Sequence, residues 1–157
     1  MAVLFSESKT KQNLMRAFAG EGQARNRYTF AAEQARKEGK PAIADIFLYT
    51  ADQERAHAGR YYELLKEASG TNIFIDGSYP VDETKTLVQL LRAAEHNEQE
   101  EAKDVYPAFA DVAKQEGFFE AAATFQQIAE IEAAHGQRFR KIADSLENNT
   151  FYMCENT

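Results

Sequence analysis

The stretch Glu132-Ala133-Ala134-His135 interrupts a run of apolar residues that recur at alternating steps of three and four. This spacing predicts a helix with one buried face. The apolar positions of the run are Phe118, Ala121, Phe125, Ile128, Phe139, Ile142 and Leu146. Glu132 and His135 continue the same phase, where leucine or isoleucine is expected. Burying an ionised carboxylate costs several kcal/mol without a partner of opposite charge, and no lysine or arginine lies in phase, so the pattern indicates a metal ion.

Three earlier helices with the same rhythm are predicted, and each has acidic or imidazole groups on its buried face. Their expected ranges are residues 10–38, 41–68 and 82–116, followed by the helix 118–146. Gly39-Lys40-Pro41 and Gly117 separate neighbouring helices, and residues 69–81 read as a loop because of their Gly, Pro and Asp-Gly signals. The polar residues in core phase are Glu21, Glu54, His57, Glu98 and Glu101.

The polar positions match in height along the predicted helices. Glu21 lies 18 residues before Gly39, and His57 lies 18 residues after it. Glu98 and His135 stand 19 residues before and 18 residues after Gly117. The middle loop of about 13 residues can span about 43 Å at roughly 3.3 Å per residue, close to the length of a helix of about 28 residues. The sequence therefore predicts an all-α, ferritin-like four-helix bundle with one long crossover between its second and third helices and a polar centre.

Composition limits the class of protein. With 157 residues, 44% of them hydrophobic, one domain over residues 1–147 is expected, with 148–157 as a tail or the start of a linker. The net charge of −7 argues against nucleic acid as a partner. The single cysteine, Cys154, excludes an internal disulfide framework, and no apolar run reaches membrane-spanning length. We expect a soluble cytoplasmic protein that binds no membrane.

The donor set indicates which metal the centre binds. Glutamates with a few imidazoles and no thiolate suit iron or manganese better than copper, and zinc fits as a substitute. Seven candidate ligands are too many for one ion. Because carboxylates can bridge two ions, Glu54 and Glu132 are the expected bridges of a two-metal site.

Four stretches are similar to the rubrerythrin family over residues 7–147. They are Gly20-Glu21-Gly22-Gln23-Ala24-Arg25-Asn26-Arg27-Tyr28, Ala51-Asp52-Gln53-Glu54-Arg55-Ala56-His57, Glu98-Gln99-Glu100-Glu101 with Tyr106-Pro107 downstream, and Glu132-Ala133-Ala134-His135. The resemblance implies a non-haem di-iron peroxidase that reduces hydrogen peroxide to water in oxidative-stress defence. It also implies two iron ions that cycle between Fe²⁺ and Fe³⁺.

The resemblance assigns roles residue by residue. It implies that the iron ligands are Glu21, Glu54, Glu98, Glu101, Glu132 and His135. It implies that His57 replaces Glu101 on one iron when the site is reduced. Tyr28 and Tyr106 resemble tyrosines that hydrogen-bond to the ligand carboxylates. By spacing, Glu95 competes with Glu101 as the partner of Glu98, but Glu95 lies off the apolar stripe.

Most members of this family continue into a rubredoxin domain with two Cys-x-x-Cys pairs, and this sequence reaches Thr157 without one. Either the protein lacks that domain, or these 157 residues are a fragment of a longer chain. Electrons are then expected from an external rubredoxin-like or flavin reductase partner, in an NADH-dependent chain. By family analogy we expect a homodimer, in which the long crossover would allow the two hairpins to exchange between chains.

Two other functions fit the same residues. A ferritin-like ferroxidase or iron-handling protein would oxidise Fe²⁺ at this pair and pass the iron onward. A structural metal would only hold the bundle together and would be redox-inert zinc without an open coordination position.

Overall fold

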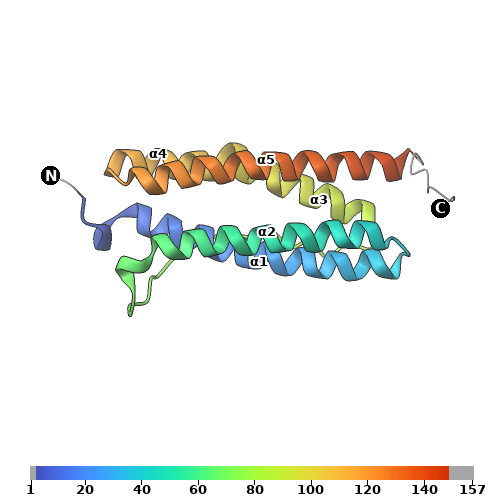
Figure 1. The fold of residues 1–157 in the computed structure, drawn as a ribbon, viewed down its shortest axis with the longest axis horizontal. Helices are drawn as coiled ribbons and strands as arrows, with labels where there is room; N and C mark the ends of the chain where they lie inside the picture. The colour runs from blue at the N-terminus through green and yellow to red at the C-terminus, as the bar shows by residue number, and fades with distance from the viewer. Residues whose placement is uncertain (1–2, 149–157) are drawn as a thin grey trace.

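The computed structural model describes residues 3–148, and in this range the chain is helical without strands. The long helices are α1 (Lys9–Lys37), α2 (Pro41–Leu64), α3 (Leu87–Glu100), α4 (Tyr106–Glu116) and α5 (Phe119–Glu147). A π-helix, η3 (Glu101–Val105), joins α3 to α4, and short 3-10 turns form η1 (Phe5–Glu7) and η2 (Lys66–Ala68). Figure 1 shows α1 beside α2 and α3–η3–α4 beside α5. The predicted all-α bundle is confirmed.

Local signals set the turns of the two hairpins. Ser8 caps α1 by accepting a hydrogen bond from the Lys11 N–H at 3.0 Å. Gly39 and Gly117 have φ values of 70° and 88°, a left-handed conformation that glycine adopts without a Cβ clash. The antiparallel pairing on each side of these glycines follows from such short turns.

The crossover is longer than predicted, and its end corrects the expected start of the third helix at residue 82. The chain stays non-helical from Ser69 until Leu87, with Thr86 as the N-cap, and the second helix ends at Leu64 rather than at residue 68. Asp82 explains the difference, because its carboxylate accepts hydrogen bonds from Arg27 on α1 at 2.6 Å and from Asn97 on α3 at 2.8 Å. These bonds hold the segment against both helices.

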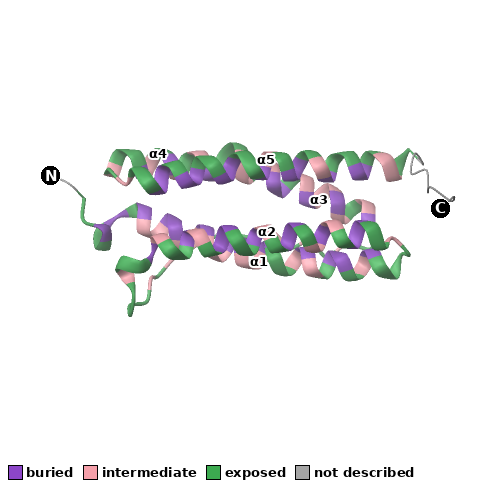
Figure 2. Cartoon of the chain, viewed as in Figure 1, coloured by how far each residue is buried: buried purple, intermediate pink, exposed green. Residues whose placement is uncertain are grey.

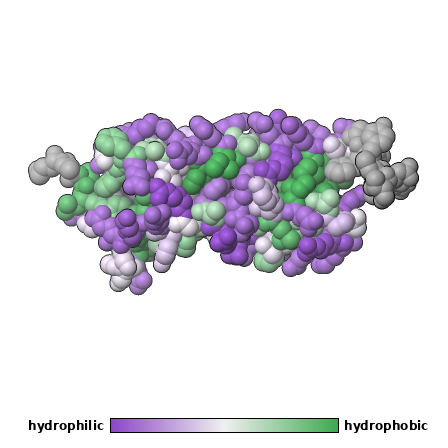
Figure 3. Space-filling model, viewed as in Figure 1, coloured by the Kyte–Doolittle hydropathy of each residue, from purple (hydrophilic) through white to green (hydrophobic). Residues whose placement is uncertain are grey.

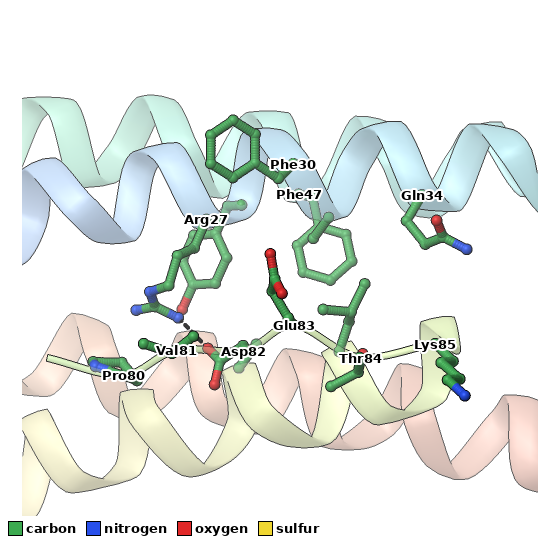
Figure 4. A pocket seen from close by; sticks show the side chains of 14 residues that line it. Arg27, Phe30, Gln34, Phe47, Pro80, Val81, Asp82, Glu83, Thr84 and Lys85 are labelled. Atoms are coloured by element: carbon green, nitrogen blue, oxygen red, sulfur yellow. Dashed lines mark hydrogen bonds and ion pairs between the residues drawn. The ribbon is translucent and has the colours of Figure 1, made fainter.

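A pocket of about 690 Å³ lies between α1 and this segment. Figure 4 shows residues 80–85 passing between α1 and α3, with the Arg27–Asp82 bond drawn. The aromatic rings of Tyr28 and Phe47 line the pocket on the bundle side. Both rings are almost fully buried, so they separate the pocket from the interior.

The π-helix corrects the prediction of one continuous α-helix over 82–116. A π turn accommodates one more residue than an α turn, so every later position is shifted in phase. The buried residues after it are Tyr106, Ala110 and Ala113, whereas the predicted Val105, Phe109 and Val112 are only partly buried. Pro107 has no N–H and its ring would clash with the Lys103 carbonyl in a regular α-helix, which favours the wider turn.

The core consists of two hydrophobic clusters separated by a polar layer. One cluster is centred on Phe47, Leu91 and Phe139, and the other on Tyr61 and Phe125. Figure 2 shows that the buried positions line the facing sides of the helices along the bundle. The layer between the clusters contains the polar residues that the sequence places in core phase.

The surface is mostly hydrophilic, and Figure 3 shows hydrophobic side chains in separate patches on one face of the molecule. Within residues 3–148, no helix combines the length and apolar character needed to cross a membrane. The predicted tail from 149 onward, including Cys154, lies outside the described residues.

Candidate metal centre

Each half of the polar layer is built around one histidine. In the first, which we call the His57 half, His57 Nδ1 lies 2.8 Å from Glu132 Oε1, 3.2 Å from Glu54 Oε2 and 3.8 Å from Glu21 Oε2. These four residues come from α1, α2 and α5, and all are buried. The i, i+3 spacing of Glu54 and His57 places both on one face of α2.

The second group, the His135 half, repeats this arrangement. His135 Nδ1 lies 2.8 Å from Glu132 Oε2, 3.1 Å from Glu54 Oε1 and 3.4 Å from Glu98 Oε2. The two imidazole rings are nearly parallel, with centroids 5.9 Å apart. In each half, four donor atoms lie within 4.8 Å of one another, as metal ligands would.

Glu54 and Glu132 belong to both halves. Each turns one carboxylate oxygen toward His57 and the other toward His135. This is the arrangement that two bridging carboxylates would have, because each oxygen could then bind a different ion.

Glu101 is the one predicted ligand that the structure does not bring into either four-residue group. It begins the π-helix and is only partly buried, whereas the other six predicted ligands are buried. Burial and the nearby carboxylates of Glu132 and Glu54 raise the pKa of Glu101 to about 8. Glu101 therefore lies at the edge of the centre, close enough for the charges of Glu132 and Glu54 to change its pKa.

Tyr28 and Tyr106 connect the layer to the two hydrophobic clusters. The Tyr28 hydroxyl donates a hydrogen bond to Glu98 Oε1, and the Tyr106 hydroxyl donates one to Glu21 Oε1. Each tyrosine thus holds one oxygen of a carboxylate whose other oxygen faces a histidine. The π-helix explains Tyr106, which would point away from the centre on an uninterrupted α-helix.

The centre concentrates negative charge in a buried place. Burial and the nearby carboxylates raise the pKa values of Glu21 and Glu98. Burial also acts on Glu54, but the adjacent His135 and His57 rings outweigh it and lower its pKa to about 2. Burial alone would lower the pKa of His135, yet the carboxylates of Glu132, Glu54 and Glu98 raise it to about 12. The buried carboxylates thus favour positive charge at this place, which bound cations would supply.

The donor atoms fit a pair of metal ions. Within residues 3–148, the buried atoms Glu21 Oε2, Glu98 Oε2, both Glu132 oxygens and His135 Nδ1 make no hydrogen bond, and the close contacts given above join them only to other candidate ligands. Such groups are costly unless they are satisfied, and a coordinated cation satisfies them. Carboxylate oxygens and imidazole nitrogens are suitable donors for iron.

Glu95, the competing candidate, points elsewhere. Its carboxylate pairs with Arg92 at 2.9 Å and with Arg140 at 2.6 Å on the outside of the α3–α5 pair. These arginines lower its pKa against the effect of burial.

Two residues near the centre had no predicted role. Tyr61 is fully buried, with its ring centroid 5.6 Å from that of Tyr106, and its hydroxyl has no hydrogen-bond partner among the described residues. Its position four residues after His57 on one helix face was the available signal. Asp82 had no comparable signal, because an acidic residue in a loop is common.

The fold and the centre together define the class. A helical bundle with one long crossover, and Glu and Glu-x-x-His groups directed into its core, is a ferritin-like di-metal carboxylate protein.

Comparison with known proteins agrees with this class and narrows it. The sequence profile of the rubrerythrin family matches residues 12–143. The chain is 48% identical to rubrerythrin of Clostridium perfringens over 147 residues, which cover 92% of this chain and 75% of the relative. It is 38% identical to rubrerythrin of Nitratidesulfovibrio vulgaris over 148 residues, or 94% and 76% of the two chains. The chain belongs to the rubrerythrin family.

Solved structures place the fold in the same group. The fully reduced, all-ferrous state of nigerythrin has a TM-score of 0.78 at 30% identity, covering 92% of this chain and 73% of the other. Desulfovibrio desulfuricans bacterioferritin, whose structures describe a diiron site, has a TM-score of 0.78 at 23% identity, covering 89% and 81%, and supports the fold alone. Family and fold identify a di-iron oxidoreductase of oxidative-stress defence.

Proposed function

We propose that this protein is a di-iron peroxidase that reduces hydrogen peroxide to water. The observation that carries the proposal is the placement of Glu54 and Glu132, each with one oxygen toward either histidine. Such a pair can hold two ions close together, and two adjacent ions that each give one electron can supply the two electrons that reduce one peroxide. Overall, H₂O₂, two protons and two electrons give two molecules of water.

In this proposal the ligands are Glu21, Glu54, His57, Glu98, Glu101, Glu132 and His135. Bound as ferrous ions, two irons supply the electrons that break the O–O bond. Glu54 and Glu132 would hold both ions, Glu98 and His135 would hold the ion of the His135 half, and Glu21 would hold the other. His57 and Glu101 would serve the same side as Glu21 in different oxidation states, and the partly buried position of Glu101, near enough to Glu132 and Glu54 for their charges to raise its pKa, supports this.

The residues around the centre orient its carboxylates and keep water away from it. Tyr28 and Tyr106 donate hydrogen bonds to Glu98 and Glu21 and so fix the orientation of these carboxylates. The two hydrophobic clusters exclude water on both sides along the bundle. A dry, fixed donor set lets the carboxylates respond to a change in charge without being displaced by solvent.

The reducing electrons come, in this proposal, from a centre outside these 157 residues. The sequence has one cysteine, too few for a rubredoxin-type iron site. We propose a rubredoxin-like or flavin reductase donor that draws on NADH in the cytoplasm. We also propose a homodimer in which the hairpins can exchange between chains, so that shortening the crossover changes the oligomer seen by size-exclusion chromatography.

The test is oxidation of the diferrous protein. The protein is loaded with two equivalents of Fe²⁺ without air and mixed in a stopped-flow instrument with hydrogen peroxide or with dioxygen, and ferric absorbance is followed. We expect oxidation far faster with peroxide. Faster reaction with dioxygen that continues as more Fe²⁺ is added would instead identify a ferroxidase. Absence of reaction with either oxidant would identify a structural metal.

A further inference from the structure

A second cavity, of about 350 Å³, opens beside the His57 half. Four segments line it: α1, the crossover at residues 77–79, the π-helix and α4. It could hold several small molecules, since a water molecule occupies about 30 Å³ in the liquid. Its lining includes Glu101 and Tyr106. The cavity therefore reaches one predicted ligand directly and touches the tyrosine that holds another, Glu21.

The larger pocket on the other side of the crossover makes no such contact with a predicted ligand. The Tyr28 and Phe47 rings, which are 2% and 0% exposed, line it on the bundle side, and Figure 4 shows Phe47 beside residues 80–85. Of the two cavities, only the smaller has a predicted ligand, Glu101, in its lining, so the smaller cavity offers the path toward the metal centre.

Tyr79 of the crossover forms the wall of this smaller cavity. Its hydroxyl donates a hydrogen bond to the Arg16 carbonyl on α1 at 2.8 Å. Its ring lies so close to Gly20 that a Cβ there would be 3.4 Å from Tyr79 Cε1. Arg16 also binds Asp76 through its side chain at 2.8 Å, which fixes the crossover on α1 just before Tyr79. The ring is thus held over the cavity, although it is 40% exposed to solvent.

The charges around this cavity favour the entry of an uncharged molecule. Among the described residues that line it, Arg16 alone is basic, and its charge is paired with Asp76. Asp104 adds a carboxylate, and Glu101 is the second acidic residue of the lining. An anion would be repelled here, whereas a small neutral molecule would not be.

We propose that this cavity is the route by which peroxide reaches the centre, and that Tyr79 sets the size of hydroperoxide that can pass. The inference rests on the proposed function. It makes Tyr79 a specificity-determining residue, one that shapes the path without touching the reacting atoms.

The test compares variants that widen and narrow the cavity. Tyr79→Ala should raise the rate constant for oxidation of the diferrous protein by cumene hydroperoxide at least tenfold relative to that for hydrogen peroxide. Ala108→Trp places a large ring into the same cavity from an exposed position on α4, and should slow both oxidants at least tenfold. Phe30→Ala widens the other pocket and is the matched control, for which no change is expected.

A binding measurement separates access from chemistry. Nitric oxide is small and uncharged and binds ferrous iron, so its association with the anaerobic protein should slow in Ala108→Trp, while iron content stays at the wild-type value. Unchanged nitric oxide association and unchanged oxidant selectivity in both cavity variants would overturn the proposed route, as would an effect of Phe30→Ala alone. If the wild-type protein does not react with hydrogen peroxide, the proposed function fails, and nitric oxide association still tests the route.

Discussion

The two halves of the metal centre share their donor chemistry but differ in their surroundings. The His135 half lies against the cluster of Phe47, Leu91 and Phe139, where the rings of Phe47 and Phe139 stack at 5.2 Å. His135 and Glu98 are 0% and 1% exposed. The His57 half instead adjoins the π-helix, a partly buried spare carboxylate and a cavity.

This difference indicates that the two halves of the centre have different roles. A sealed half with regular helices keeps its ion and its geometry, whereas a half bounded by an irregular turn can change a ligand and admit a small molecule. π-Bulges often occur at functional sites because they re-aim side chains at the expense of regular hydrogen bonding. Both halves depend on the carboxylates they share, and the following predictions test that asymmetry.

The largest effect is expected from removing the shared carboxylates. The double variant Glu54→Ala, Glu132→Ala removes two oxygen donors from each half. Iron content should therefore fall from about two ions per chain to almost none. Metal analysis after anaerobic loading measures this. Glu130→Ala, an exposed glutamate on the same helix as Glu132, is the control. A double variant that still bound two irons and consumed peroxide normally would refute the assigned centre.

Removing each histidine separately tests the asymmetry directly. His135→Ala should reduce iron to about one per chain, because no spare ligand lies beside the sealed half. His57→Ala should keep two ferric irons, since Glu101 can serve that side, and should lose iron only on reduction. Iron analysis of oxidised and dithionite-treated samples measures both. Equal losses in the two variants would contradict the asymmetry.

The tyrosines of the His57 half form a matched pair for stability. Tyr106→Phe removes a hydrogen bond to a buried carboxylate and should lower the free energy of unfolding of the metal-free protein by about 1–3 kcal/mol. Tyr61→Phe removes a hydroxyl that has no hydrogen-bond partner within the described chain, and should change it little. Urea denaturation measures both. If Tyr61→Phe lowered the free energy of unfolding more than Tyr106→Phe does, the hydrogen bond from Tyr106 to Glu21 would not be the source of the stability.

The smallest effect concerns the ends of the bundle. Glu116, at the end beyond the His57 half, accepts hydrogen bonds from Lys9 N–H and from Thr10 N–H and hydroxyl. Glu38, at the other end, accepts one backbone hydrogen bond, from Leu87 N–H, and one from the side-chain amide of Gln34. Thr10 and Lys9 lower the pKa of Glu116 although burial opposes this. A lowered folded-state pKa gives stability that is present above the unfolded pKa of about 4.3 and lost as the pH falls through the folded value.

Glu116→Gln should therefore lower the free energy of unfolding by about 0.5 kcal/mol at neutral pH and by almost nothing near pH 3. The value is at the low end because the Glu116 carboxylate is partly exposed. Glu38→Gln should cost less at neutral pH. Thermal unfolding as a function of pH measures the difference, and a cost for Glu116→Gln that grew toward acid would contradict the sign.

The regular parts of this molecule follow from sequence periodicity. The burial of Glu21, Glu54, Glu98, Glu132 and the two histidines in one layer could be predicted, because a polar residue in core phase is costly and several such residues share one height along the helices. Their role as ligands stays a prediction. The long crossover was predictable from its turn residues. These features depend on local patterns that repeat every three or four residues.

The irregular parts do not follow from periodicity. A π turn changes the phase by one residue, so that an ideal-helix count places Val105 inside where the structure has Tyr106. Only Pro107 signals the change. Asp82 holds the crossover in place by accepting hydrogen bonds from Arg27 and Asn97, which are 55 and 15 residues away in sequence. Such contacts depend on the folded arrangement, and a single sequence does not contain a local sign of them.

The most direct test of the central claim is anomalous diffraction at the iron edge from crystals of the iron-loaded protein. We expect two iron peaks, with Glu54 and Glu132 between them, His135 on one ion, and His57 or Glu101 on the other according to oxidation state. A single peak, or two peaks that do not share Glu54 and Glu132, would contradict the shared-carboxylate centre.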